Sequence, residues 1–133
     1  MEFISGFEAA LIVRLVLAVI FGWLIGLERE TLGKTAGTRT FALVAVGAAL
    51  FSLVSDGGAQ QVAAGIGFLG AGLIIQREGR VEGLTTAAAL WAAGGLGMIL
   101  GQGYLMVGTV ATILILVITY LLRFLHPENW KGK

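Results

Sequence analysis

Long runs of apolar residues separated by short polar stretches dominate the chain. Five such runs cover roughly residues 7–27, 40–54, 61–75, 84–100 and 104–125. Because an α-helix rises about 1.5 Å per residue and a bilayer core is about 30 Å thick, the first and last runs are long enough to cross alone. The three middle runs are marginal by length. Their continuous apolarity beside two full-length runs predicts that they insert as well, with local thinning of the bilayer or packing against neighbouring helices.

The composition supports this interpretation and excludes several classes of function. Hydrophobic residues make up 57% of the 133 residues and charged residues 13%, so the bilayer is the expected solvent. A net charge of +1 argues against nucleic acid as a partner, since phosphate binding needs a basic excess. Without cysteine, and with His126 as the single histidine, the chain has no thiolate or His-rich metal motif. No Ser-His or Asp-Asp catalytic arrangement is visible, so we expect no enzyme.

The positive charges predict how the runs cross the membrane. Eight cations lie after the first and third runs and at or beyond the end of the fifth, and none lies in the leading segment, the 55–60 loop or the 101–103 turn. These are Arg29, Lys34, Arg39, Arg77, Arg80, Arg123, Lys131 and Lys133. Cytoplasmic loops collect Lys and Arg, so five crossings place the N-terminus outside and the C-terminus in the cytoplasm. We therefore predict an all-α membrane protein in which residues 1–133 form one compact bundle of five glycine-rich transmembrane helices.

The 21 glycines predict where the helices pack together, because small residues let helix backbones approach closely in lipid. The third run has four glycines in eight residues and is the predicted centre of the bundle, crossed by the fourth run. Its GxGxxG string lacks the preceding strand of a nucleotide site. The predicted packing glycines are Gly22, Gly26, Gly65, Gly67, Gly70, Gly72, Gly94 and Gly95.

Arg14 is the one cation in the interior of a predicted crossing, and a charge there costs at least about 2.5 kcal/mol unless it finds a partner or water. One interpretation is structural: the side chain snorkels or forms an ion pair with Asp56 of the outer loop. The other is that Arg14 and Asp56 frame a polar cavity for an ion or a proton. Replacement of Arg14 by leucine without loss of folding or function would contradict both.

Polar residues gather at the predicted cytoplasmic end of the first run. Glu28, Arg29 and Glu30 precede a glycine-containing loop that ends at Arg39 and Thr40. An ion-pair network is the first interpretation, with partner docking and a hydrated Mg²⁺ as alternatives. Gln61 marks an end of the third run. Trp91 lies inside the fourth run, where we expect it to fill the core opposite glycine.

Several motifs in order give the chain a resemblance to a known family. They are Arg14, GWLIGLERE at 22–30, GTRT at 37–40, Gln61, GIGFLGAG at 65–72, GLTTAA at 83–88 and Leu90-Trp91. Together these motifs resemble the MgtC/SapB family of bacterial inner-membrane proteins over about residues 10–101. The motif positions that the resemblance marks as functional candidates are Arg14, Glu28, Arg29, Glu30, Arg39, Thr40, Asp56, Gln61, Thr85, Thr86 and Trp91.

The resemblance implies a multi-pass protein of the bacterial inner membrane that is linked to magnesium homeostasis, acid stress or virulence. It also implies action by interaction with another membrane complex such as the proton-driven ATP synthase, without enzymatic activity or a cofactor. A magnesium or proton channel built as a homo-oligomer is the alternative, and a homodimer is the favoured assembly in either case. The family's name-giving member carries a further cytoplasmic domain, so this chain looks like the short form or a truncated one.

Overall fold

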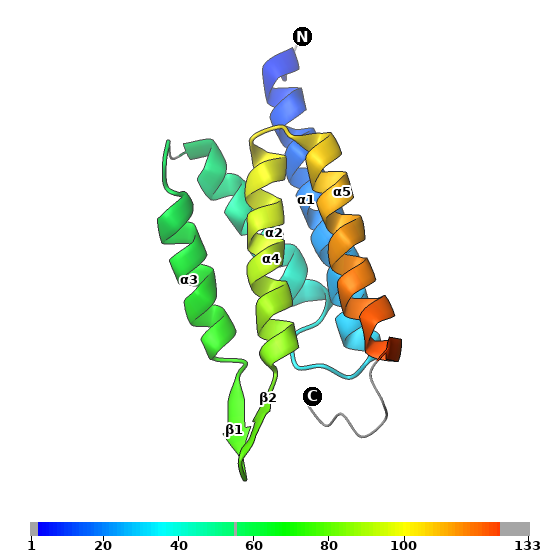
Figure 1. Cartoon of the computed structure of the whole chain (residues 1–133). Coiled ribbons are helices and arrows are strands. Elements are labelled where there is room, and N and C mark those ends of the chain that lie inside the picture. Colours follow the sequence, from blue (N-terminus) through cyan, green and yellow to red (C-terminus); the bar gives the residue numbers. More distant parts are fainter. Residues whose placement is uncertain (1–2, 55, 126–133) are drawn as a thin grey trace.

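The computed structural model describes residues 3–54 and 56–125; His126, Lys131 and Lys133 lie outside these ranges. Five α-helices run up and down in chain order (Figure 1). Their bounds are α1 Gly6–Thr31, α2 Thr38–Val54, α3 Ala59–Ala71, α4 Leu84–Gly101 and α5 Leu105–Leu116. A π-helical turn, η1 Val117–Leu121, and a 3₁₀ turn, η2 Leu122–Leu125, continue α5. The all-α prediction is thus confirmed for most of the chain, with one two-stranded exception between α3 and α4.

Among residues 3–54 and 56–125, three segments are long and apolar enough to cross a membrane: α1, α4 and the continuous helix from Leu105 to Leu125. The apolar helix α2 is shorter, with 17 residues. The 13 residues of α3 reach about 20 Å. The third apolar run was predicted to continue to Ile75, but the helix ends at Ala71 and Ile75 begins a strand.

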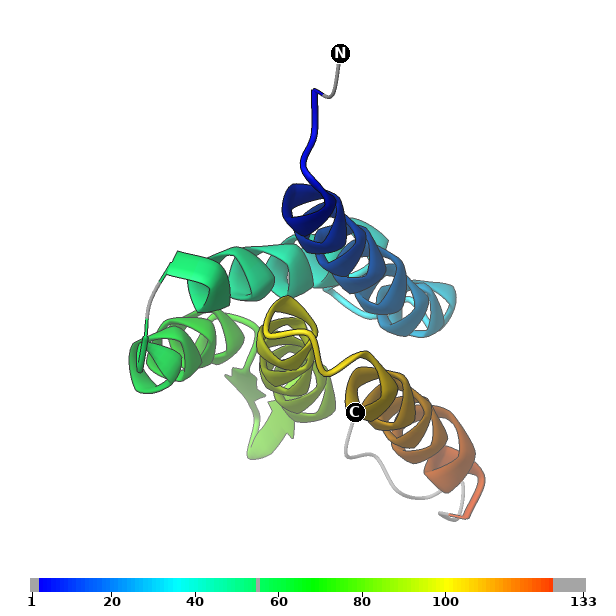
Figure 2. The ribbon, with the colours of Figure 1, turned by 90° about the horizontal axis from the view of Figure 1, so that it is seen from above.

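The helix α4 lies at the centre of the bundle, and α3 lies at its edge (Figure 2). Ten residues of α4 are buried, whereas α3 buries Ile66 and Gly70. The prediction that the third run forms the centre is therefore wrong. The physical reason is that six of these ten buried residues of α4 are alanine or glycine, so neighbouring helices can approach its backbone closely.

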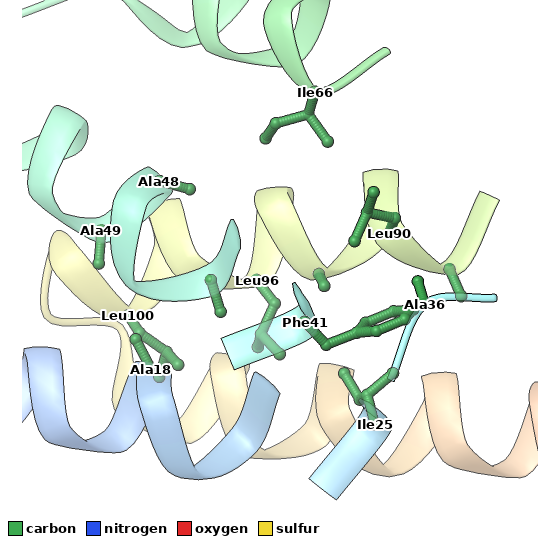
Figure 3. Close-up of a cluster of buried hydrophobic side chains, with 13 residues drawn as sticks. Ala18, Ile25, Ala36, Phe41, Ala48, Ala49, Ile66, Leu90, Leu96 and Leu100 are labelled. Atoms are coloured by element: carbon green, nitrogen blue, oxygen red, sulfur yellow. The ribbon is translucent and has the colours of Figure 1, made fainter. Parts of the chain in front are cut away.

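The core is built from few large side chains and many small ones. Phe41, Ile25, Leu90, Leu96 and Leu100 are the largest fully buried side chains. The Phe41 ring of α2 lies among Ile25 of α1, Ala36 of the α1–α2 loop and Leu90 of α4 (Figure 3). Small residues fill most of the other core positions, which brings the helix backbones close enough for van der Waals contact.

A short β-hairpin joins α3 to α4. Strand β1, Ile75–Arg77, pairs antiparallel with β2, Arg80–Glu82. The turn residues Glu78 and Gly79 both have positive φ, 47° and 77°, as a two-residue hairpin turn of the primed type requires. The hairpin ends at Gly83, the N-cap of α4, whose φ of 82° is left-handed.

Because successive helices run in opposite directions, the segments that connect them lie alternately at the two ends of the bundle. The α1–α2 loop, the hairpin and η2 lie at one end, and the α2–α3 loop and the α4–α5 turn lie at the other (Figure 1). Every described residue of the predicted cytoplasmic set belongs to the first end: Arg29, Lys34, Arg39, Arg77, Arg80 and Arg123. We call it the basic end.

Candidate functional site

A buried ion pair lies in the last turn of α1, at the basic end of the bundle. Arg29 is 2% exposed, and its Nε lies 2.7 Å from Oε2 of the neighbouring Glu28, while Nη2 donates to Oε1 at 3.0 Å. The two bonds form a bidentate contact, which a guanidinium and a carboxylate make with matched geometry. Arg29 also lies in the last turn of α1, where the helix dipole favours a cation.

The same guanidinium ties α1 to the far end of the chain. Nη2 of Arg29 donates to the carbonyl oxygen of Thr119 at 3.3 Å. Thr119 belongs to the π-helical turn η1, and its hydroxyl donates to the Ile115 carbonyl at 2.9 Å. Local π geometry changes the register of a helix, and such turns are frequent at functional sites. Arg29 is therefore the point where α1 and the α5 extension meet.

The remaining residues of the predicted network form a separate contact. Glu30 is exposed and its Oε2 accepts a hydrogen bond of 3.0 Å from the hydroxyl of Thr38 at the start of α2. Gly37 lies against the Glu30 side chain, since a Cβ there would meet Oε1 at 3.0 Å. Arg39 and Thr40 are exposed on the first turn of α2 and take no part in the buried pair. The structure thus brings Glu28 and Arg29 together but leaves Arg39 out.

Arg14 is half-buried in the opposite half of the bundle. Its Nη1 donates to the carbonyl oxygen of Gly101, the last residue of α4, at 3.2 Å. The guanidinium lies against Gly103 in the α4–α5 turn, which has a φ of 94°. Orphan carbonyls at a helix C-terminus attract cationic donors. The predicted ion pair of Arg14 with Asp56 is wrong among the described residues, because the guanidinium closes the end of α4 instead.

Asp56 and Gln61 line a groove between α2 and α3. The groove has a volume of about 720 Å³. Apolar and small residues form the rest of its lining, with Val44 and Ala48 from α2 and Val62 and Ile66 from α3. Asp56 is exposed at the end of the groove that belongs to the α2–α3 loop. The two predicted candidates therefore share one site, which is separate from Arg14.

Thr85, Thr86 and Trp91 lie on α4. Thr86 is buried at 2% exposure, whereas Thr85 is exposed and neither caps the helix, whose N-cap is Gly83. A Cβ on Gly83 would overlap the Leu73 carbonyl oxygen, so this position requires glycine. Trp91 is 59% exposed, and the predicted core role is wrong. Its helix position faces outward because alanines and glycines on the other faces of α4 make the packing contacts.

The predicted packing glycines fall into two groups. Gly22 and Gly26 face the start of α2, Gly94 faces Ile66, and Gly70 faces Ala87. In contrast, a Cβ at Gly65, Gly67 or Gly95 would meet no heavy atom within 4 Å, and one at Gly72 would meet the Leu69 carbonyl of its own segment. The prediction is wrong for this second group within one copy of the chain, because α3 contacts its neighbours along one narrow face and Gly95 lies on the exposed side of α4.

Several contacts were missed from the sequence. Gly97 and Gly101 pack against Ala45 and Ala49 of α2, in addition to the predicted contact between the third and fourth runs. Their spacing of four, which is the small-xxx-small pattern, was the available signal. The hairpin also had a signal, since Glu78-Gly79 separates two short polar-apolar segments. Nothing in the sequence indicates that the Thr119 carbonyl accepts from Arg29.

Metal binding has little support from the described residues. Within residues 3–54 and 56–125, no group of three His, Asp or Glu side chains comes together to hold an ion. Glu28 is occupied by Arg29, and Glu30 by Thr38. The Mg²⁺ alternative for the 28–30 segment therefore has no ligand cluster there.

Comparison with known proteins gives the family. The family model described as MgtC family matches residues 15–127. The chain is 40% identical to the putative magnesium transporter YhiD of Escherichia coli K12, with 87% of this chain and 63% of YhiD aligned. It is 43% identical to Protein SrpB of Synechococcus elongatus, over 78% of this chain and 70% of SrpB. It is 46% identical to Protein MgtC of Salmonella typhimurium, over 84% of this chain and 52% of MgtC.

The alignments with YhiD and MgtC leave more than a third of each relative uncovered. No solved structure matches the chain. The apolar helices α1, α4 and 105–125 agree with a membrane location, and the family model covers the elements that hold the Glu28–Arg29 pair, the Asp56 groove and Trp91. This chain is a membrane protein that belongs to the MgtC family.

Proposed function

We propose that this protein is a non-enzymatic regulator in the bacterial inner membrane that acts by binding another membrane complex under magnesium limitation or acid stress. The ATP synthase, implied by the family resemblance, is the first partner to test. The chain crosses the membrane five times in this proposal, with the basic end in the cytoplasm. Membership of the MgtC family and the segregation of the described cations to one end support it.

The observation that carries the proposal is that both arginines of α1, Arg14 and Arg29, are engaged by acceptors within the bundle. Ionisable groups in membrane segments mark transport paths when they face a water-filled cavity. Here Arg14 binds the Gly101 carbonyl, and Arg29 binds Glu28 and the Thr119 carbonyl. Each guanidinium therefore joins two parts of the bundle. The charges act as structural contacts, and the outward faces of the helices are left for partners.

The face we assign to the partner follows α4. Leu84, Ala88, Trp91 and Gly95 are exposed at helical spacing. Figure 2 shows that α4 is open on the side between α3 and α5, away from α1 and α2. Small residues beside a large aromatic ring suit a second helix, since Trp is common in binding hot spots and Gly allows close approach. We call this stripe the α4 face. A second copy of the chain, giving a homodimer, competes for it in this proposal.

Co-purification tests the proposal. A tagged chain expressed at low Mg²⁺ is extracted from native membranes and probed for ATP synthase subunits. We expect capture by the wild type and by Trp23→Ala, which removes a tryptophan of similar exposure, 44%, from α1. Trp91→Ala should lose most of the capture without unfolding the bundle. Absence of ATP synthase from the wild-type sample would overturn the choice of partner, and equal capture by both variants would overturn the α4 face.

A homo-oligomeric channel or carrier for magnesium or protons is the second candidate. Asp56 supports it, since the carboxylate lines the α2–α3 groove without an ion pair among the described residues. The name of the relative YhiD, a putative magnesium transporter, points the same way. Purified protein in liposomes with internal Mg²⁺ and pH indicators separates the two functions. Flux above empty vesicles that Asp56→Asn abolishes would establish the channel and contradict a regulator without transport.

A further inference from the structure

The α2–α3 groove is open, apolar along its length and polar at one end. Its outer walls are exposed large side chains, with Leu43 69%, Phe51 59% and Leu69 55% exposed. Gly47 and Gly65 lie between them, and a Cβ at either glycine would meet no atom within 4 Å. From position 43 to 51 of α2 and from 61 to 69 of α3, the groove follows each helix for about 12 Å. Such a shape accommodates a narrow, unbranched chain.

We propose that this groove binds a membrane phospholipid with a primary-amine head group, of the phosphatidylethanolamine type. The acyl chain lies along Gly47 and Gly65, and the ammonium group contacts the carboxylate of Asp56 at the loop end. The proposal rests on the five-crossing placement, which puts both helices in the lipid. It does not depend on which complex the α4 face binds.

The apolar lining explains why a lipid chain fills the groove but not why one lipid is preferred. Lipid tails are as apolar as the Leu and Phe side chains of the walls, so exchange of one tail for another is nearly neutral. Selectivity must come from the polar end. There the groove presents the Asp56 carboxylate and the Gln61 amide, at the boundary between the helices and the α2–α3 loop.

The charge at that end selects an ammonium donor. Neither the 55–60 loop nor the 101–103 turn contains Lys or Arg. Arg14, which lies in the same half of the bundle, donates its hydrogen bond to Gly101. An ammonium group offers three N–H donors to the Asp56 carboxylate, whereas a quaternary choline offers none. Phosphatidylglycerol has no cation to offset its phosphate, so its net negative charge is repelled by Asp56. The Gln61 amide can donate to the lipid phosphate.

The same charge disfavours a second copy of the chain as the occupant. A two-fold interface uses the same patch on both subunits. Two copies joined through this groove would therefore bring two Asp56 carboxylates toward each other, and like charges repel. A lipid amine supplies the opposite charge instead.

Native mass spectrometry of the purified chain with added lipids tests the proposal. The probes are phosphatidylethanolamine, phosphatidylcholine and phosphatidylglycerol with identical acyl chains. We expect about a tenfold preference for the ethanolamine lipid, as a charge-assisted hydrogen bond gives. Asp56→Asn should abolish the preference, while Glu8→Gln, which removes a carboxylate outside the groove, should keep it. Equal binding of the three lipids, or an unchanged preference in Asp56→Asn, would overturn the proposal.

Filling the groove provides the second arm of the test. Gly47→Leu and Gly65→Leu introduce side chains into free space and also raise helix propensity, so both should fold. We expect each to reduce the bound ethanolamine lipid severalfold, while Gly67→Leu, an equally open position on α3 outside the groove, leaves it unchanged. If Gly65→Leu instead converts a dimer to a monomer with lipid binding intact, the groove holds a second copy and the proposal is wrong.

Discussion

Replacement of Glu28 by glutamine removes the negative charge that pairs with Arg29, the most buried arginine among the described residues. In the wild type the Glu28 side chain is 9% exposed and the Arg29 side chain 3%. Two hydrogen bonds of 2.7 and 3.0 Å join them. Glu28→Gln leaves the guanidinium with one neutral carbonyl, that of Thr119, and an amide oxygen. Breaking a buried pair costs 3–5 kcal/mol in general, and the retained acceptors favour the lower end, so we expect a loss of about 3 kcal/mol.

The double variant Glu28→Gln, Arg29→Met separates pairing from packing. It removes both charges and keeps an apolar side chain of similar length, and such replacements are often neutral, so its stability should lie within about 1 kcal/mol of the wild type. Glu30→Gln is the exposed control, with an expected loss below about 1 kcal/mol. Reversible SDS titration in mixed micelles, followed by tryptophan fluorescence, measures the free energies. Glu28→Gln within about 1 kcal/mol of the wild type, or a double variant less stable than Glu28→Gln, would refute the reasoning.

Three further changes test the packing. Gly97→Ala should destabilise the bundle by about 2 kcal/mol, because its Cβ would overlap the Ala45 carbonyl, whereas Gly95→Ala in open space should stabilise it by about 0.5 kcal/mol in the same titration. Gly79→Ala should lower stability by about 1–2 kcal/mol, because alanine is strained in the left-handed conformation of that turn. Gly83→Ala should lower it further, because its Cβ would also overlap the Leu73 carbonyl. Arg14→Met should cost about 1.5 kcal/mol by removing the hydrogen bond to Gly101, and exposure of the α4–α5 turn to protease should rise. Equal stability of the two variants in either glycine pair would contradict the corresponding backbone contact. Unchanged protease sensitivity of the α4–α5 turn in Arg14→Met would contradict the contact of Arg14 with Gly101.

The positions of the helices could be predicted from hydropathy because each apolar run is bounded by polar or glycine-containing segments. The relative placement of α3 and α4 could not. Both are rich in glycine, and composition does not tell whether a glycine such as Gly65 contacts another helix or open space. The spacing of Gly97 and Gly101 carried that information, since both lie on one face and contact α2.

The sequence identified the candidate polar residues from their residue type and their position in the apolar runs, but it did not identify their hydrogen-bond partners. Arg14 was assigned to Asp56 because opposite charges attract, yet the carbonyl at the end of α4 is the acceptor that the geometry supplies. Glu28 and Arg29 were expected in a network with Arg39, and the buried pair formed between adjacent residues instead. Backbone acceptors such as the Thr119 carbonyl have no sequence signature, because every residue carries the same group.

The five-crossing arrangement underlies the partner face and the lipid groove, and cysteine accessibility tests it most directly. The chain contains no cysteine, so Thr35→Cys, Gln60→Cys, Glu78→Cys and Gln102→Cys each give a unique thiol at one end of the bundle. In intact cells, a membrane-impermeant maleimide should label positions 60 and 102. It should label positions 35 and 78 only after the membrane has been permeabilised. Labelling of positions 35 and 60 from the same side would show that α2 does not cross, and would contradict the account.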